Sequence, residues 1–298
     1  MEQNILQPEL RKTNKRPTLI IGGIIVTLLF LLGLGSAYFF WYLPKDQAKE
    51  YLESSQPLFD TIEKKVMSAK ENTFLDANTQ YHRREDAKDD NLLDIEELEG
   101  VLGDIESVRK DLSDLKRPKI VLELDRELHV YLDKAEQVLK LHLEEQKLYQ
   151  KVIDAYGDDL DREINQYTEM SYTGGNRTQF ILQTQRVVDF AEDALSRINN
   201  IKTPQEGEDV FTYKIRKENV EDIKETFTKL NEYYRLFQFD RVDAEIQGIT
   251  ERNNAMNERV KEHGKDYITN SDVAQGFQSL EDQAQDLRNI YQEIRKEL

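Results

Sequence analysis

The chain has 298 residues, 33% of them charged, a formal net charge of −17 and no cysteine. The acidic balance is unfavourable for binding nucleic acid, and the absence of cysteine excludes disulfides, thiolate metal sites and cysteine nucleophiles. Glycine and proline are scarce, at 13 and 6 residues, which favours long helices over many short strands and predicts an all-α fold.

The N-terminal part of the chain predicts a membrane anchor. Residues 18–43 form an uncharged run, which as a helix would reach about 39 Å and exceed a bilayer core of about 30 Å. Tyr38, Trp41 and Tyr42 near its end suit the lipid–water boundary. A cleaved signal peptide is the alternative, but its apolar core is usually only about 7–15 residues long. We therefore expect an uncleaved transmembrane helix.

The charges beside this run predict its orientation. Residues 1–17 carry four basic side chains, Arg11, Lys12, Lys15 and Arg16. Because positively charged flanks stay in the cytoplasm, residues 1–17 should form a cytoplasmic tail and residues 44–298 should be extracytoplasmic. The chain would contact the lipid bilayer through residues 18–43.

Beyond the anchor, apolar residues recur at helical spacing, interrupted by prolines and polar segments. Pro44, Pro118 and Pro204 should each open an outgoing helix that ends in a loop and is followed by a return helix. The loops are expected at residues 72–91, 171–176 and 264–270. The sequence thus predicts an elongated bundle of about six helices, in three tandem helical hairpins at residues 44–117, 118–203 and 204–298.

Two features qualify the hairpin prediction. In each return helix, successive apolar residues are 4, 3, 4 and 3 positions apart. This shared spacing indicates either a duplication or ordinary coiled-coil packing. The outgoing segments of about 50 residues are twice as long as the return helices, so they must kink, and Gly157 is the expected kink in the second. If the hairpins stack on the anchor, the joints at 116–118 and 202–204 lie near the membrane and the loops lie far from it.

No residue pattern predicts a chemistry. The four histidines, His82, His129, His142 and His263, lack the spacing of helical metal sites. The carboxylates near Gly157–Asp161 do not fit a calcium loop, although weak divalent-ion binding there is possible. We therefore predict no catalytic, cofactor-binding or metal-binding residue, no cofactor and no enzymatic activity.

One aromatic cluster has two interpretations. Tyr233, Tyr234, Phe237 and Phe239 cover too wide an arc for one helical stripe. They are expected to pack in the core or, alternatively, to line a partner groove or a small apolar pocket.

These observations favour a structural or protein-interaction module of the cell envelope, with a protein partner that the sequence does not identify. The alternative is an extracytoplasmic small-ligand sensor or binding subunit that signals through a partner membrane protein. One membrane span followed by helical hairpins resembles spectrin-like bacterial division regulators in layout, although no motif is shared. Those proteins hold their helices in the cytoplasm, so an inverted topology would imply a cytoplasmic scaffold.

Overall fold

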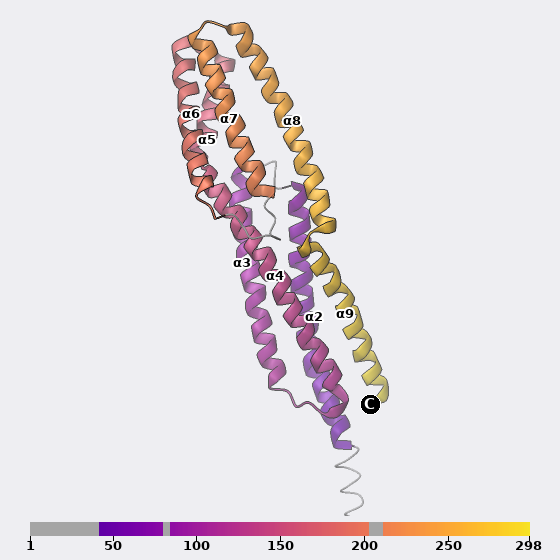
Figure 1. Ribbon diagram of the computed structural model, residues 1–298. Coiled ribbons are helices and arrows are strands. Elements are labelled where there is room, and N and C mark those ends of the chain that lie inside the picture. The colour runs from indigo at the N-terminus through magenta and orange to yellow at the C-terminus, as the bar shows by residue number, and fades with distance from the viewer. Residues whose placement is uncertain (1–41, 80–83, 203–210) are drawn as a thin grey trace, which may run out of the picture.

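The computed structural model describes residues 42–79, 84–202 and 211–298, and every regular element in these ranges is helical (Figure 1). The elements are α2 (Leu43–Thr79), α3 (Arg84–Ser113), the 3₁₀ turn η2 (Lys119–Val121), α4 (Leu122–Tyr156), α5 (Asp158–Thr173), α6 (Arg177–Asn199), α7 (Phe211–Arg235), α8 (Phe239–Asn270) and α9 (Asp272–Glu297). The all-α prediction is confirmed for the described residues.

The predicted membrane anchor cannot be followed in the same way. Residues 18–41 lie outside the described ranges, and Leu43 is the first residue of α2. Among the helices of residues 42–79, 84–202 and 211–298, none is long and apolar enough to cross a membrane.

The lower half of the molecule is a closed four-helix bundle of α2, α3, α4 and α9, in which each helix packs on two neighbours. Aromatic rings fill its centre. Phe59 meets Tyr131 edge-on, with ring centroids 5.3 Å apart, and stacks on Tyr291 at 6.2 Å. All three side chains are almost fully buried, so this core resembles the interior of an ordinary helical bundle.

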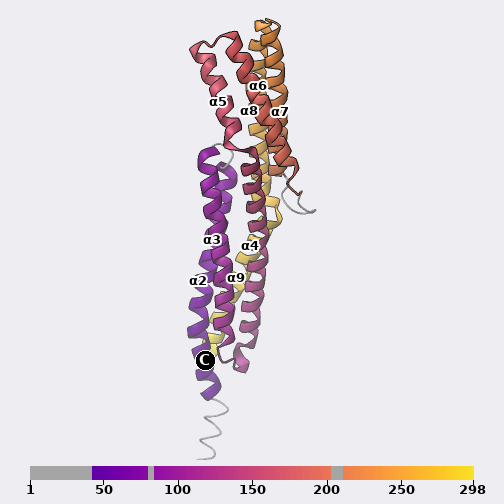
Figure 2. The ribbon, with the colours of Figure 1, turned by 90° about the vertical axis from the view of Figure 1, so that its left-hand side faces the viewer.

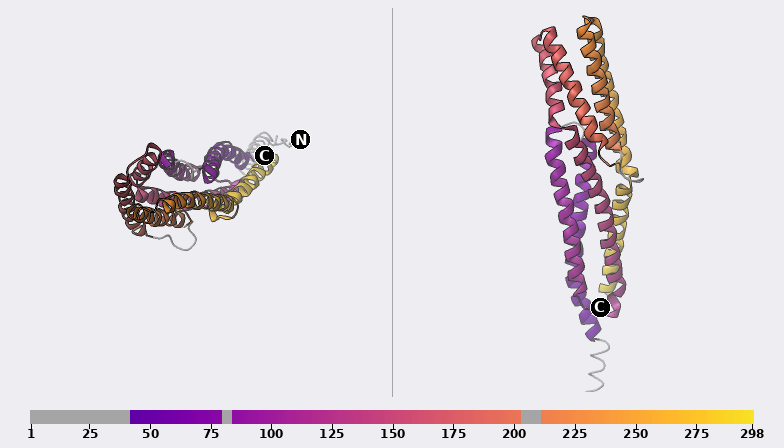
Figure 3. Two further views of the ribbon diagram at one scale, coloured as in Figure 1. Left: turned by 90° about the horizontal axis from the view of Figure 1, so that it is seen from above. Right: turned by 60° about the vertical axis from the view of Figure 1, so that its left-hand side comes forward.

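The upper half consists of α5, α6, α7 and α8, with the end of α4 reaching into a second core. Here each helix packs on the next in chain order, whereas α5 and α8 pack on the helices between them and make no comparable contact with each other. Figure 2 shows the two halves one above the other, and the view from above in Figure 3 shows that the helix ends follow a curved outline.

The chain ends define the orientation of the molecule. The ammonium of Lys45, near the start of α2, donates to the backbone oxygen of Glu297 at 2.8 Å, so the described N-terminal end and the C-terminus lie together at the base. The turns at residues 174–176 and 236–238 lie at the opposite end, which we call the distal tip (Figure 1).

Two local predictions are confirmed, one of them in part. Gly157 separates α4 from α5 with a φ of 75°. Of the expected loop at 171–176, residues 174–176 form a turn, whereas α5 continues to Thr173. Side-chain caps begin the next helices: Asn176 caps α6 in a capping box with Gln179. The Ser271 hydroxyl accepts a hydrogen bond from the Ala274 backbone N–H and caps α9.

Two predicted loops are wrong. α2 continues to Thr79 and α3 begins at Arg84, so most of the expected loop at 72–91 is helical. Polar residues can form a helix without apolar residues at regular spacing, and a prediction from sequence depends on that spacing. The expected break at 264–270 is absent because α8 runs to Asn270. One glycine within a helix costs only about 1 kcal/mol, which packing can offset.

A break that was not predicted changes the third hairpin. The outgoing segment beyond Pro204 divides into α7 and α8 at residues 236–238. The chain therefore turns at the distal tip after α7 and descends through α8 and α9, and the described end of α6 lies at mid-height instead of at the base (Figure 1). The two long outgoing segments thus give four helices, which is why more than the expected six are present. Packing follows the lower and upper halves and not the segments 44–117, 118–203 and 204–298.

Candidate functional site

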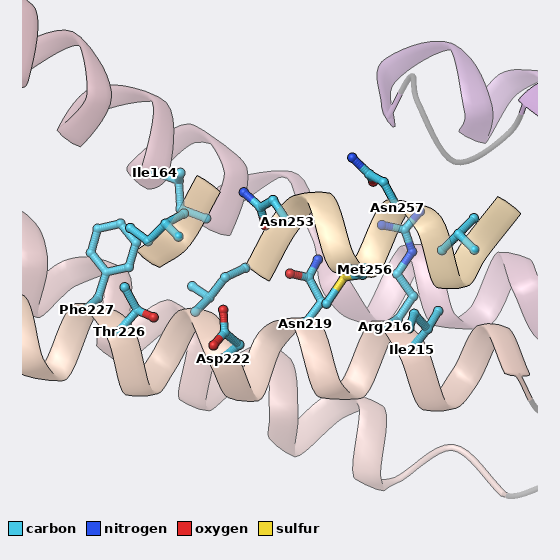
Figure 4. A pocket seen from close by; sticks show the side chains of 13 residues that line it. Ile164, Ile215, Arg216, Asn219, Asp222, Thr226, Phe227, Asn253, Met256 and Asn257 are labelled. Atoms are coloured by element: carbon cyan, nitrogen blue, oxygen red, sulfur yellow. The ribbon is translucent and has the colours of Figure 1, made fainter. Parts of the chain in front are cut away.

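The candidate site is a groove in the upper half, where α5 and α8 do not close on each other. Its cavity measures about 330 Å³. The groove runs along α7 from Ile215 to Phe227, about 18 Å at helical rise. α8 forms one wall, Ile164 of α5 lies at the other side, and Figure 4 shows side chains of the three helices around the same space. We call it the α5–α8 groove.

The groove combines an apolar lining with a row of amides. The apolar lining is Ile164, Ile215, Ile223, Phe227, Ile249, Met256 and Val260. Asn219 of α7 and Asn253 and Asn257 of α8 add three carboxamides (Figure 4). None of these three side chains has a hydrogen-bond partner among the described residues. Each amide therefore offers both donors and an acceptor to a bound molecule.

A network of ion pairs neutralises the carboxylate of Asp222 at the groove and links α7 to α8. The guanidinium of Arg252 lies 2.8 Å from a carboxylate oxygen of Asp222 and 3.0 Å from one of Glu245. Partial burial opposes the charge of Arg252, but the two carboxylates prevail and raise its pKa. Arg252 also donates to the Thr226 hydroxyl at 2.7 Å. Asp222 and Arg216 are the two charged residues of the lining, which otherwise consists of apolar groups, amides and the Thr226 hydroxyl.

The core beneath the groove is unusually polar. The Gln183 amide donates to the backbone oxygen and carboxylate of Glu163, at 2.8 and 2.9 Å. Tyr167 and Tyr234 share a buried hydrogen bond of 3.1 Å between their hydroxyls. Burial, and then this bond, raise the pKa of Tyr167. Such bonds fix the positions of α5, α6 and α7, and hence the shape of the groove.

The distal tip is a second exposed feature. Phe237 has a φ of 59°, its ring is 64% exposed, and the Arg177 guanidinium carbon lies 3.6 Å from the ring centroid. Arg177 also donates to the backbone oxygens of Tyr234 and Arg235, at 2.6 and 2.8 Å. Tyr172, Leu236 and Phe239 are exposed beside it. The distal tip is therefore an apolar surface whose conformation is stabilised by the contacts of Arg177.

The four aromatic residues at positions 233–239 do not share one environment in the structure. Tyr234 is buried and stacks on Phe180 with ring centroids 4.9 Å apart, so core packing holds for this residue. Tyr233 is half-buried, whereas Phe237 and Phe239 are exposed at the tip. None of the four lines the α5–α8 groove.

The predicted absence of a metal site stays a prediction, although the residues considered for one can be located. Nδ1 of His129 lies 2.8 Å from the backbone oxygen of Asp125, and His142 is buried beside Glu145. The ring of His263 stacks on that of Phe211, with centroids 3.7 Å apart. His82 lies outside the described residues. In the described ranges, no three histidine or carboxylate side chains come together as a metal-binding group.

The groove residues were missed at the sequence level, but a signal for them exists. Ile249, Asn253, Met256 and Val260 recur at steps of 4, 3 and 4, the spacing of a helix face that packs on other helices. Only the structure shows that part of this face has no neighbouring helix.

Comparisons with known proteins add no relative. No protein-family model matches the chain, and neither the curated proteins nor the solved structures contain a match. The geometry alone defines the class: the described residues form an elongated all-helical structure with one closed and one open four-helix half.

Proposed function

We propose that this chain is a membrane-anchored, extracytoplasmic protein-interaction module of the cell envelope. In this proposal residues 18–43 hold it in the bilayer, the closed lower half acts as a rigid stalk, and the upper half carries the binding surface. No catalytic step is part of the proposal.

One observation carries the proposal: the open groove and the apolar tip lie in the half remote from the chain ends. The lower half begins directly after the predicted anchor and also holds the C-terminus. α4 and α5 contain 35 and 16 residues, which at helical rise amounts to about 75 Å. An anchor at the base would thus present the groove and the tip well away from the lipid, as a partner-binding surface requires.

The charge distribution supports the stalk. The described lower half contains 33 acidic and 20 basic residues, whereas the described upper half contains 20 and 16. The half nearest the bilayer is therefore the more acidic, and anionic lipid should repel it. This repulsion would keep the stalk upright beside the membrane.

A second candidate function is small-ligand binding or sensing. The cavity of about 330 Å³ falls within the range of ligand pockets, about 300–1,000 Å³. A ligand screen by thermal shift tests this function, because a specific ligand stabilises the folded chain. A compound that raises Tm saturably, and fails to do so in Met256→Glu, would favour it.

Topology is the first test of the main proposal. A reporter fused after Leu298 should be active only outside the cytoplasm, and the fused chain should remain with the membrane fraction after alkaline washing. Cytoplasmic activity of the fusion would overturn the envelope assignment and favour the cytoplasmic scaffold instead.

Affinity capture is the second test. The full chain, solubilised from its native membranes, should retain at least one envelope protein through its upper half. Substitutions on the upper half should release this protein, while exposed substitutions on the stalk such as Asp133→Ala should not. If both sets of variants retain the same proteins, the upper half is not the binding surface.

A further inference from the structure

We infer that the α5–α8 groove receives one amphipathic helix of a partner protein, about three turns long, which completes the open half as a helical bundle. This inference rests on the proposed interaction function and names the class of partner. It concerns only the groove, and the distal tip plays no part in it.

The two halves of the molecule differ in how their helices close around the core. In the lower half, α2, α3, α4 and α9 form a closed ring around their core. In the upper half, α5 and α8 leave a seam above α7, and this seam contains the cavity. The seam extends about 18 Å along α7 and about 16 Å along α8, from Ile249 to Val260. A helix of about 11–13 residues matches that length.

The spacing of the lining side chains matches a helix. On α8 the groove is lined at Ile249, Asn253, Met256 and Val260, at steps of 4, 3 and 4. This is the a/d spacing at which one helix inserts side chains between those of another. An extended peptide repeats every two residues and would not match this lining over its length. The cavity would accommodate the inward side chains of a partner helix, and the backbone of that helix would lie along the opening of the groove.

The three amides of the groove could specify the register of a bound helix. Asn219, Asn253 and Asn257 interrupt the apolar lining near its middle (Figure 4). A polar residue at a seam position costs stability but specifies register and partner in helical bundles. The partner helix should therefore carry Leu, Ile or Met at its seam positions and one Asn or Gln opposite the amides.

The charges of the upper half indicate the composition of the partner helix. Asp222 is already paired with Arg252, and Arg216 is the other charged residue of the lining, so the inward face of the partner should carry no basic residue. The described upper half contains 20 acidic and 16 basic residues, and this acidic excess favours a helix with Lys or Arg on its flanks and speeds its association. The expected occupant is thus a helix that is apolar inside and basic at its edges.

Site-specific crosslinking tests the inference on the full chain in its native membranes. A photoreactive phenylalanine analogue replaces Asn219 or Asn253 in the groove, or Asn254 outside the groove lining as the matched control. Crosslinks from the two groove positions should map to partner residues three or four apart on one apolar stripe. The control position should give none of them.

Two charge variants provide the second readout. Met256→Glu places a carboxylate inside the groove and should reduce the crosslink from Asn253 at least tenfold. Ala255→Glu places the same charge on the neighbouring, exposed position of α8 and should change it less than twofold. Circular dichroism of both variants checks that the helices are intact, and Met256→Leu should retain the crosslink if the glutamate variant fails to fold.

The inference is overturned if the crosslinked partner residues are two apart, if only a lipid or small molecule is labelled, or if the groove positions give no specific product. A partner that crosslinks from Tyr172 at the tip, but not from the groove, would overturn the inference and leave the proposed interaction function standing. Absence of any protein product from both regions would contradict both.

Discussion

The two halves use the same number of helices but differ in closure and in the chemistry of their cores. The lower half is closed, and its core is dominated by large apolar and aromatic side chains. The upper half leaves one seam open and buries five polar side chains beside a smaller apolar core, Glu163, Gln183, Thr184, Thr226 and Asn231, whereas the lower half buries Ser55, Glu63 and His142. Polar groups that must be paired fix relative positions but contribute less stability than apolar packing does. We therefore expect the lower half to contribute most of the stability, and we propose the upper half as the recognition surface.

The largest effect should come from the lower core. Phe59 is almost fully buried and its ring contacts the rings of Tyr131 and Tyr291, so Phe59→Ala should lower the free energy of unfolding by about 3–5 kcal/mol. Phe227 of the upper half borders the groove. Its neighbours can relax into that space, so Phe227→Ala should cost less, about 2–3 kcal/mol.

Urea unfolding of the full chain in detergent measures both values, and hydrogen exchange in α3 and α6 reports the two halves separately. Similar costs for the two variants would mean that the upper half is packed as tightly as the lower half. The assignment of stability to the lower half would then be wrong.

The next effect concerns the junction between the halves. Gly157 joins α4 to α5 with φ 75° and ψ 147°, a conformation essentially restricted to glycine, so Gly157→Ala should cost about 1–3 kcal/mol. A Cβ at this position would also lie 2.9 Å from Nη2 of Arg197, the residue whose Nε donates to the backbone oxygen of Ala155 at 2.8 Å. Gly174 at the tip, with φ 83° and open space around it, is the matched control and should cost only about 1 kcal/mol.

Hydrogen exchange again distinguishes the outcomes. Gly157→Ala should weaken protection in both α4 and α6, because Arg197 of α6 caps the end of α4. A loss of protection confined to α5 would show that the halves are not coupled through this residue.

Such junctions also show which parts of the fold were predictable. Where a helix ends at a glycine, as at Gly157, the sequence carries the signal and the prediction was correct. The turn after α7 was missed because Phe237 occupies the left-handed position that glycine usually fills. The helical ends of α2 and α3 were missed because their polar residues show no apolar period.

The candidate site was less predictable for a different reason. The stripe of Ile249, Asn253, Met256 and Val260 has the same spacing as stripes that pack inside either core. Whether a stripe is covered depends on which helices lie beside it, and this follows from tertiary packing. The asparagines were therefore visible in the sequence, but their exposure in a groove was not.

Alkaline pH should weaken the lower half in particular. Burial raises the pKa of Tyr51, Tyr131 and Tyr291 in that half above their ordinary value of 10.0. These hydroxyls stay protonated in the folded state, while those of the unfolded chain ionise above about pH 10. The stabilising effect is thus fully present below pH 10 and is lost as the pH rises further. Tyr167 and Tyr234 act in the same direction in the upper half.

Two variants separate this pH effect from hydrogen bonding. The hydroxyl of Tyr131 is buried without a hydrogen-bond partner among the described residues, so Tyr131→Phe should leave stability unchanged or raise it by about 1 kcal/mol at pH 7. Tyr291 donates to the Ser55 hydroxyl at 2.9 Å or accepts from it, so Tyr291→Phe should cost about 1 kcal/mol. Urea unfolding at pH 7 and pH 11 should show a smaller alkaline loss in both variants. If both variants lose as much stability at pH 11 as the unmodified protein, groups other than these two tyrosines cause the alkaline sensitivity.

The smallest effect on stability is expected at the distal tip. Gln238 donates its backbone N–H to the Tyr233 oxygen at 2.9 Å across Phe237, a helix ending in which glycine normally occupies the Phe237 position. Phe237→Gly relieves the left-handed strain but removes the ring beneath Arg177, so the net change should stay within about 1 kcal/mol. A loss above 2 kcal/mol would make the tip a structural element and bring the upper half closer to the lower one. A small loss would mean that stability does not explain an exposed phenylalanine at a glycine position, and would support a binding role for the tip.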